Sequence, residues 1–93
     1  MRIIGAIDHP TLKITVFKMD EKFSIKFENG LLEQTFKIHA GSDINSLEDI
    51  KKLVDPAWLS EVMQMLQQMN QSKLAATSRF LSVNEEEEFD EII

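Results

Sequence analysis

Apolar and polar residues alternate in two stretches of the first half of the chain. Residues 12–18 and residues 22–28 each place an apolar side chain at every second position. In a strand, a period of two sends successive side chains to opposite faces of the sheet. Each stretch therefore predicts a strand with one apolar face towards a core and one mixed face towards solvent.

Asn29-Gly30 separates the second of these stretches from a third, residues 31–39. The pair is typical of a type I′ turn, because both central positions of that turn need a positive φ. A hairpin closed on this pair places Glu28 opposite Leu31. It also places Gln34 on the apolar face, where the amide would need a hydrogen-bond partner.

The connection at residues 19–22 leaves the register of the first hairpin open. A tight loop pairs Val16 with Phe23, and a longer loop shifts the pairing by two residues while keeping the same faces. Residues 2–7 carry apolar side chains on both faces, which favours a more buried strand. The predicted sheet is a four-stranded antiparallel meander with strands near residues 2–7, 12–18, 22–28 and 31–39.

The second half of the chain contains two helix starts. Ser46 is a candidate N-cap for a short helix over residues 47–54. Asp55-Pro56 combines a capping carboxylate with proline at the first helical position, and predicts a long helix over residues 56–71 or beyond. A run of strands followed by helices indicates an α+β fold. We therefore predict one two-layer α+β domain over residues 1–81, with both helices packed on the sheet.

The long helix has a wide apolar face and no charge over much of its length. At about 100° per residue, the apolar side chains between residues 58 and 69 fill half of the helical wheel. From Val62 to Ser72 no residue is charged, and the other half of the wheel is rich in glutamine. Methionine suits adaptable contact surfaces, and an uncharged face is easier to cover than a charged one. The predicted partner-interface residues are Trp58, Met63, Met65 and Met69.

A purely structural interpretation of the same helix is also open, in which the methionines fill the core and glutamine is only a neutral helix former. Past Ser72 the apolar pattern weakens, because Lys73 falls near the centre of the apolar arc. The helix therefore bends, ends or leaves the domain at this point. A separate segment would then contain Leu74, Phe80, Leu81 and Val83.

Charge divides the chain into a neutral domain and an acidic tail. The formal net charge is −6, and residues 82–93 hold six acidic residues and no basic one. A run of like charge is usually solvated, yet this one contains apolar residues at helical spacing. It resembles the acidic, apolar-tipped C-termini with which some single-stranded-DNA-binding proteins recruit basic partners. The tail residues predicted to bind a partner are Glu85, Glu86, Glu87, Glu88, Phe89, Ile92 and Ile93.

The solvent face of the sheet carries several lysines and one aromatic residue. Lys22, Lys26 and Lys37 lie on this face with Phe17. Such a face resembles platforms for single-stranded nucleic acids, where bases stack on rings and lysines meet phosphates. One phenylalanine is a poor stacking platform, however, and lysine alternating with threonine is common on exposed strands. Nucleic-acid binding, masked by the acidic tail, is therefore the alternative function and the less favoured one.

Catalytic and cofactor motifs are missing from the sequence. Without cysteine there is no thiol nucleophile and no thiolate metal site. His9 and His39 have no partner at metal-ligand spacing, and no phosphate-binding loop or nucleophile motif occurs. We expect a non-enzymatic protein without cofactor or metal. Asp8 interrupts the first apolar stretch too early for a signal peptide, and no membrane span is present, so we expect a cytoplasmic protein.

The stretch from Thr15 through Lys37 resembles a set of short, uncharacterised bacterial proteins. The stretch includes Thr15-Val16-Phe17 and Lys26-Phe27-Glu28-Asn29-Gly30-Leu31-Leu32-Glu33-Gln34-Thr35-Phe36-Lys37, and Leu53-Val54-Asp55 fits the same pattern. The resemblance implies a sheet-plus-helix domain and brings no catalytic residue. The sequence as a whole predicts a small protein-interaction module. Such a module would pair most economically as a homodimer through its long helix, or bind another protein.

Overall fold

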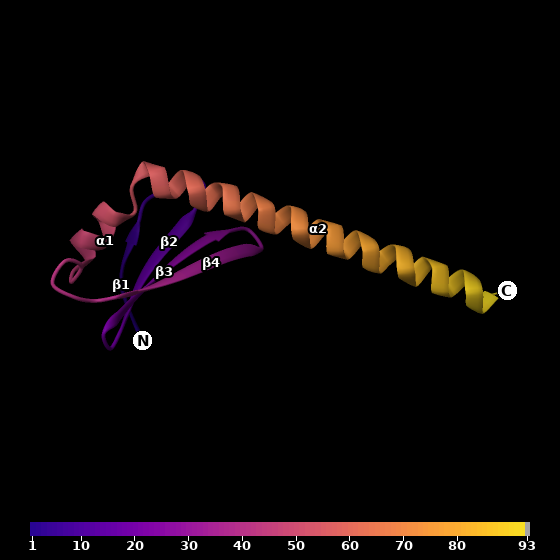
Figure 1. Cartoon of the computed structure of the whole chain (residues 1–93), viewed down its shortest axis with the longest axis horizontal. Coiled ribbons are helices and arrows are strands. Elements are labelled where there is room, and N and C mark those ends of the chain that lie inside the picture. The colour runs from indigo at the N-terminus through magenta and orange to yellow at the C-terminus, as the bar shows by residue number, and fades with distance from the viewer. Residues whose placement is uncertain (93) are drawn as a thin grey trace.

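The computed structural model describes the backbone of residues 1–92 and the side chains of residues 1–83. In this part, the elements follow the order β1 (Arg2–Ile7), β2 (Lys13–Met19), β3 (Lys22–Asn29), β4 (Leu32–His39), α1 (Leu47–Leu53) and α2 (Pro56–Ile92). The strands form one antiparallel sheet in the order β1-β2-β3-β4 (Figure 1). The predicted α+β class and the four-stranded antiparallel meander are confirmed.

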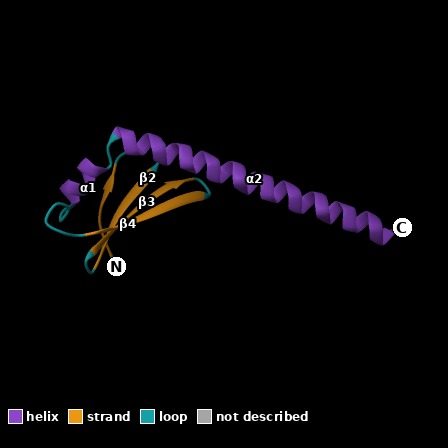
Figure 2. Ribbon diagram, viewed as in Figure 1, coloured by secondary structure: helices purple, strands orange, loops and turns teal. Residues whose placement is uncertain are grey.

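The core lies between one face of the sheet and the two helices, as Figure 2 shows. Its buried apolar residues are Leu12, Ile14, Val16, Phe23, Ile25, Phe27, Ile50, Val54, Val62 and Leu66. The six from the sheet region occupy the alternating positions that the period of two assigned to the apolar face. Two more come from α1 and its C-terminal end, and the last two come from α2.

The β3–β4 hairpin is shifted by two residues from the predicted register. Asn29 pairs with Leu32, so the loop is Gly30-Leu31 and not Asn29-Gly30. Gly30 has a φ of +62°, while Leu31 does not have a positive φ. A positive φ at the first central position alone is typical of a type II′ turn, which places glycine there. A shift of two leaves every side chain on its predicted face, so the pattern could not detect it.

The β2–β3 hairpin resolves the register that the sequence left open. Val16 pairs with Ile25, two residues away from the pairing with Phe23. Met19 pairs with Lys22, so a two-residue loop closes this hairpin too. Its first residue, Asp20, has a φ of +48°, in the left-handed region that aspartate tolerates better than most side chains.

β1 is an edge strand and not the more buried strand that its apolar residues predicted. It pairs with β2 alone, and Ile3 is exposed. The register shifts between Ile3 and Gly5, which makes Ile4 an extra residue in the strand. Such a bulge interrupts the alternation. Ile4 and Ile7 therefore both pack against the core, although they are three residues apart.

α1 begins at the predicted cap. The Ser46 hydroxyl accepts a hydrogen bond from the Asp49 N–H at 3.3 Å, and the Asp49 carboxylate accepts one from the Asn45 N–H at 3.0 Å. The arrangement differs from a standard capping box in that the Asp49 carboxylate bonds the N–H of the residue before the cap. The Asn45 N–H and the Ser46 hydroxyl hold the pKa of the Asp49 carboxyl below its ordinary value. The helix ends at Leu53, one residue before the predicted end.

α2 begins at Pro56 as predicted and continues past the sheet as one helix. Asp55 caps it, since its carboxylate accepts a hydrogen bond from the Trp58 N–H at 2.9 Å. Only the first part of α2 lies over the sheet (Figure 1). The helix therefore leaves the domain after Ser72, one of the three expected outcomes, and does so without a break. The prediction of a separate segment for residues 74–83 is wrong, because these residues belong to α2.

Leu66 and Leu31 provide a matched test of α2 docking. Leu66 is a core residue of α2 and only 2% of its surface is exposed, whereas Leu31, in the β3–β4 turn, is 92% exposed. We expect Leu66→Ala to lower the free energy of unfolding by about 2–5 kcal/mol, because it leaves a cavity between helix and sheet. Leu31→Ala should change it by less than about 0.5 kcal/mol. Urea unfolding followed by Trp58 fluorescence measures both, and equal losses would contradict the docking.

Candidate interaction surface

Trp58, on the first turn of α2, packs against its own sheet. Its ring meets Phe36 edge-on at 5.0 Å between centroids and Phe27 at 5.5 Å. Phe27 and Phe36 are themselves an edge-to-face pair at 5.9 Å. Each such pair contributes about 0.5–1.5 kcal/mol beyond the area that it buries. This predicted interface residue therefore holds the start of α2 on β3 and β4.

Met65 and Met69 are half-buried and also pack against the core. Gln34 of β4 lies beneath Met65, and its amide nitrogen donates to the Met65 sulfur at 3.7 Å. The Gln34 Oε1 is buried and has no hydrogen-bond partner among the described residues. A thioether is a weak acceptor. The sequence predicted that Gln34 would need a hydrogen-bond partner on the apolar face. Its nitrogen has a weak acceptor there, and its oxygen has no partner among the described residues.

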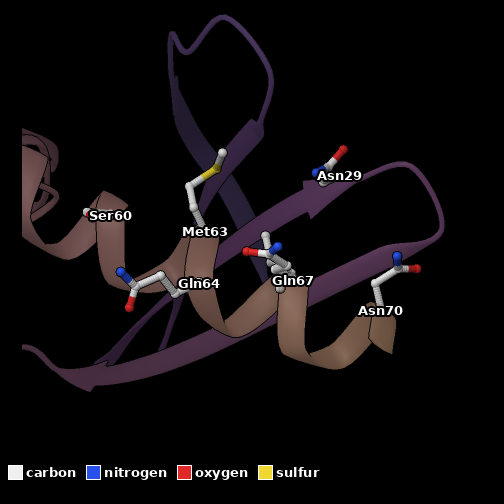
Figure 3. Close-up of a pocket in the computed structure, with 7 residues that line it drawn as sticks. Asn29, Ser60, Met63, Gln64, Gln67 and Asn70 are labelled. Atoms are coloured by element: carbon white, nitrogen blue, oxygen red, sulfur yellow. The ribbon is translucent and has the colours of Figure 1, made fainter. Parts of the chain in front are cut away.

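Met63 differs from the other three predicted interface residues, because it is 39% exposed. It stands at the wall of a surface hollow of about 430 Å³ between α2 and the end of β3. Figure 3 shows Asn29 on the strand side and the remaining labelled residues on α2. The hollow is lined by Asn29, Ser60, Met63, Gln64, Leu66, Gln67 and Asn70. Amides and apolar groups line it, and none of these residues is charged.

The part of α2 beyond the sheet exposes large apolar side chains. Four of them are between 51% and 63% exposed: Leu74, Phe80, Leu81 and Val83. At about 100° per residue, Leu74 and Leu81 lie within about 20° of each other, whereas Phe80 and Val83 lie on other sides of the helix. Leu74 and Leu81 therefore form an exposed apolar stripe, and no part of the sheet lies beneath it.

The structure thus divides the predicted site. Trp58, Met65 and Met69 lie against the sheet, and Met63 lies beside the hollow. Leu74 and Leu81 were not among the predicted interface residues, yet they are 11 and 18 residues beyond Met63. Both spacings are close to whole numbers of helical turns, and this signal could have placed them on one stripe. The side chains of the tail residues, from Glu85 to Ile93, lie outside the described residues.

On the outer face of the sheet, Lys26 makes local contacts. Lys26 lies 3.4 Å from the Glu28 carboxylate and 3.8 Å from that of Glu33. Its ammonium group also lies 6.0 Å from the centre of the Phe17 ring. Lys26 and Phe17 are the two groups that a stacking platform would need together. In the structure Lys26 is within ion-pair distance of one carboxylate on β3 and one on β4, and it lies near the Phe17 ring of β2.

Catalytic groups do not gather anywhere in the described part of the chain. The His9 ring nitrogen Nδ1 accepts hydrogen bonds from the N–H groups of Thr11 and Leu12, so this histidine shapes the β1–β2 turn. Among the described residues, no three side chains of the metal-binding types stand close enough to share an ion. The described helices also include none with the length and apolarity needed to cross a membrane.

Comparison of the chain with protein-family models, with curated proteins and with solved structures finds no match. No relative therefore indicates a ligand, a reaction or a partner. The surfaces of the chain itself are the basis for any functional inference. Among them, the exposed side of α2 carries large apolar side chains that do not enter the core.

The buried Gln34 amide makes a prediction about the packing under α2. We expect Gln34→Met to raise the free energy of unfolding by about 1 kcal/mol, because it removes a buried oxygen without a partner and keeps the shape of the side chain. Gln68→Met, at an exposed position of α2, is the matched control and should change it little. Urea unfolding measures both variants. A loss of stability in Gln34→Met would show that the amide oxygen is satisfied in solution.

Proposed function

We propose that this protein is a non-enzymatic interaction module that self-associates through α2. The observation that carries the proposal is the part of α2 beyond the sheet, which exposes four large apolar side chains, two of them, Leu74 and Leu81, on one side of the helix. A helix of this kind is only marginally stable in water by itself, since helices in proteins gain most of their stability from a packed apolar face. A partner that covers the extension supplies that packing.

The free energy gained by burying these side chains in a dimer is comparable with the cost of association. Complete burial of one such side chain contributes about 1.5–3 kcal/mol. Leu74 and Leu81 share one side of the helix, so two copies bring four such side chains to a shared interface. The loss of translational and rotational freedom on association costs an estimated 4–15 kcal/mol. The charge-free stretch from Val62 to Ser72 adds to this balance, because no ion there must be desolvated.

A second copy of the chain is the simplest partner for this surface, because the chain already carries the matching surface. In a two-fold dimer the same patch lies on both sides of the interface. Each helix then both offers and covers an apolar stripe. One unpaired apolar surface per chain therefore suffices, and no second patch is needed.

The acidic segment supplies the second part of the proposal. Glu85, Glu86, Glu87 and Glu88 precede Phe89 and Ile92 on the helix backbone, with Ile93 after them. This support comes from sequence alone. Carboxylates steer association and apolar anchors fill pockets. Nucleic-acid binding by the lysine face has less support, because Lys26 stands within ion-pair distance of two carboxylates.

Charge placed on the exposed stripe tests the proposal. We expect the full chain to have about twice its 10.7 kDa mass in light scattering at micromolar concentration. The double variant Leu74→Glu/Leu81→Glu should have the monomer mass, because it places four carboxylates in the dimer interface. Its sheet and core should persist, since both residues lie beyond the sheet. Near-ultraviolet circular dichroism of Trp58 measures that persistence.

The double variant Ser72→Glu/Ala75→Glu is the matched control for this experiment. It adds the same charge to the same helix on the side away from Leu74 and Leu81, and it should remain a dimer. Equal dissociation of both variants would show that added charge alone separates the subunits. A wild-type chain that stays monomeric across the concentration series would contradict self-association.

A further inference from the structure

The apolar stripe on the exposed side of α2 has a symmetric spacing. Met63, Leu74, Leu81 and Ile92 are separated by 11, 7 and 11 residues. All four positions fall within about 20° of one another on a helix with 100° per residue. Since α2 runs from Pro56 to Ile92, one helix carries the whole set. The spacing reads the same in both directions, and its midpoint lies between Thr77 and Ser78.

A stripe that is symmetric about its midpoint matches itself when a second copy is turned end for end. We propose that two copies pair antiparallel along α2, about a two-fold axis at Thr77-Ser78. Leu74 then lies opposite the partner's Leu81, and position 63 lies opposite position 92 of the partner's helix. The inference rests on the proposed self-association and specifies its direction and register.

Charge selects the antiparallel direction. The last turns of α2 contain six acidic residues between Glu85 and Glu91. A parallel pair would bring the two acidic runs side by side, and like charges in that position repel. An antiparallel pair about Thr77-Ser78 holds them at opposite ends of the interface. The direction of pairing is therefore set by the most strongly charged segment of the chain.

The same register explains the charge-free stretch of α2. Residues 85–91 of one copy lie opposite residues 64–70 of the other, which are glutamine, methionine, leucine and asparagine. Gln64, Gln67 and Asn70 are exposed on α2. Their amide groups are hydrogen-bond donors, and carboxylates are acceptors. The acidic run thus meets amides in the partner and no carboxylate.

The surface hollow of about 430 Å³ lies where the end of the partner helix arrives. Met63, Gln67 and Asn70 line it, and the register places residues 85–92 of the second copy opposite residues 63–70 (Figure 3). Apolar groups of Met63 and Leu66 stand among its amides. In this register, position 92 of the partner's helix, an isoleucine in the sequence, lies opposite Met63. The hollow, the acidic run and the symmetric stripe thus all agree with one arrangement.

Disulfide trapping tests the direction of pairing, because the chain has no cysteine of its own. The full-length variants Leu74→Cys and Leu81→Cys, one of them with a mass tag, are mixed and oxidised mildly. We expect the mixed 74–81 product to exceed both 74–74 and 81–81 products by at least about tenfold. In the antiparallel register, two copies of residue 74 are about 10 Å apart along the axis, which exceeds the span of a disulfide.

A second pair of variants tests the register at the hollow. Met63→Cys mixed with Ile92→Cys should also give the mixed product, while Gln68→Cys mixed with Ile92→Cys, on another side of the helix, should not. Predominant 74–74 and 81–81 products would show parallel pairing and overturn the inference. A dimer by light scattering without any of these products would overturn it as well, and would leave self-association standing. A monomer by light scattering would overturn both.

Discussion

The packing of Trp58 between α2 and the sheet is the contact on which the rest of the structure depends. Trp58 rests on Phe27 of β3 and Phe36 of β4. Val62 and Leu66 follow it into the core one and two turns later. These contacts fix where α2 crosses the sheet and which of its sides is covered. The direction of the rest of the helix, and the side that it exposes, follow from them.

A difference in length between helix and sheet creates the candidate site. The longest strands have eight residues and span about 26 Å, whereas α2 has 37 residues and extends for about 55 Å. The sheet can therefore cover only the first part of the helix. Beyond that point the apolar side chains of Leu74 and Leu81 have no core to enter, and they continue the stripe that begins at Met63. An interaction surface is then a consequence of geometry and needs no specialised motif.

Some sequence patterns predicted the structure correctly and others did not, depending on what each pattern can distinguish. Alternation assigned the core face of β2 and β3 correctly, because a strand has only two faces. The Asn29-Gly30 turn signal gave the wrong register for β3 and β4, and the alternation could not correct it, since a shift of two residues preserves the faces. The bulge at Ile4 changed the alternation in β1, so an edge strand was taken for a buried one. Lys73 interrupted the apolar pattern of α2, although the exposed helix accommodates a lysine there.

The sequence by itself determined the fold class, both helix starts and the separation of the acidic run from the neutral domain. These depend on local chemistry: the period of the apolar residues, the caps at Ser46 and Asp55, and the charge of each side chain. Only the tertiary structure decided that Trp58, Met65 and Met69 face the sheet while Met63 faces outward. That division depends on which surfaces meet and where the sheet ends. A helical wheel shows which residues share a side, but only the docked sheet determines which side is covered.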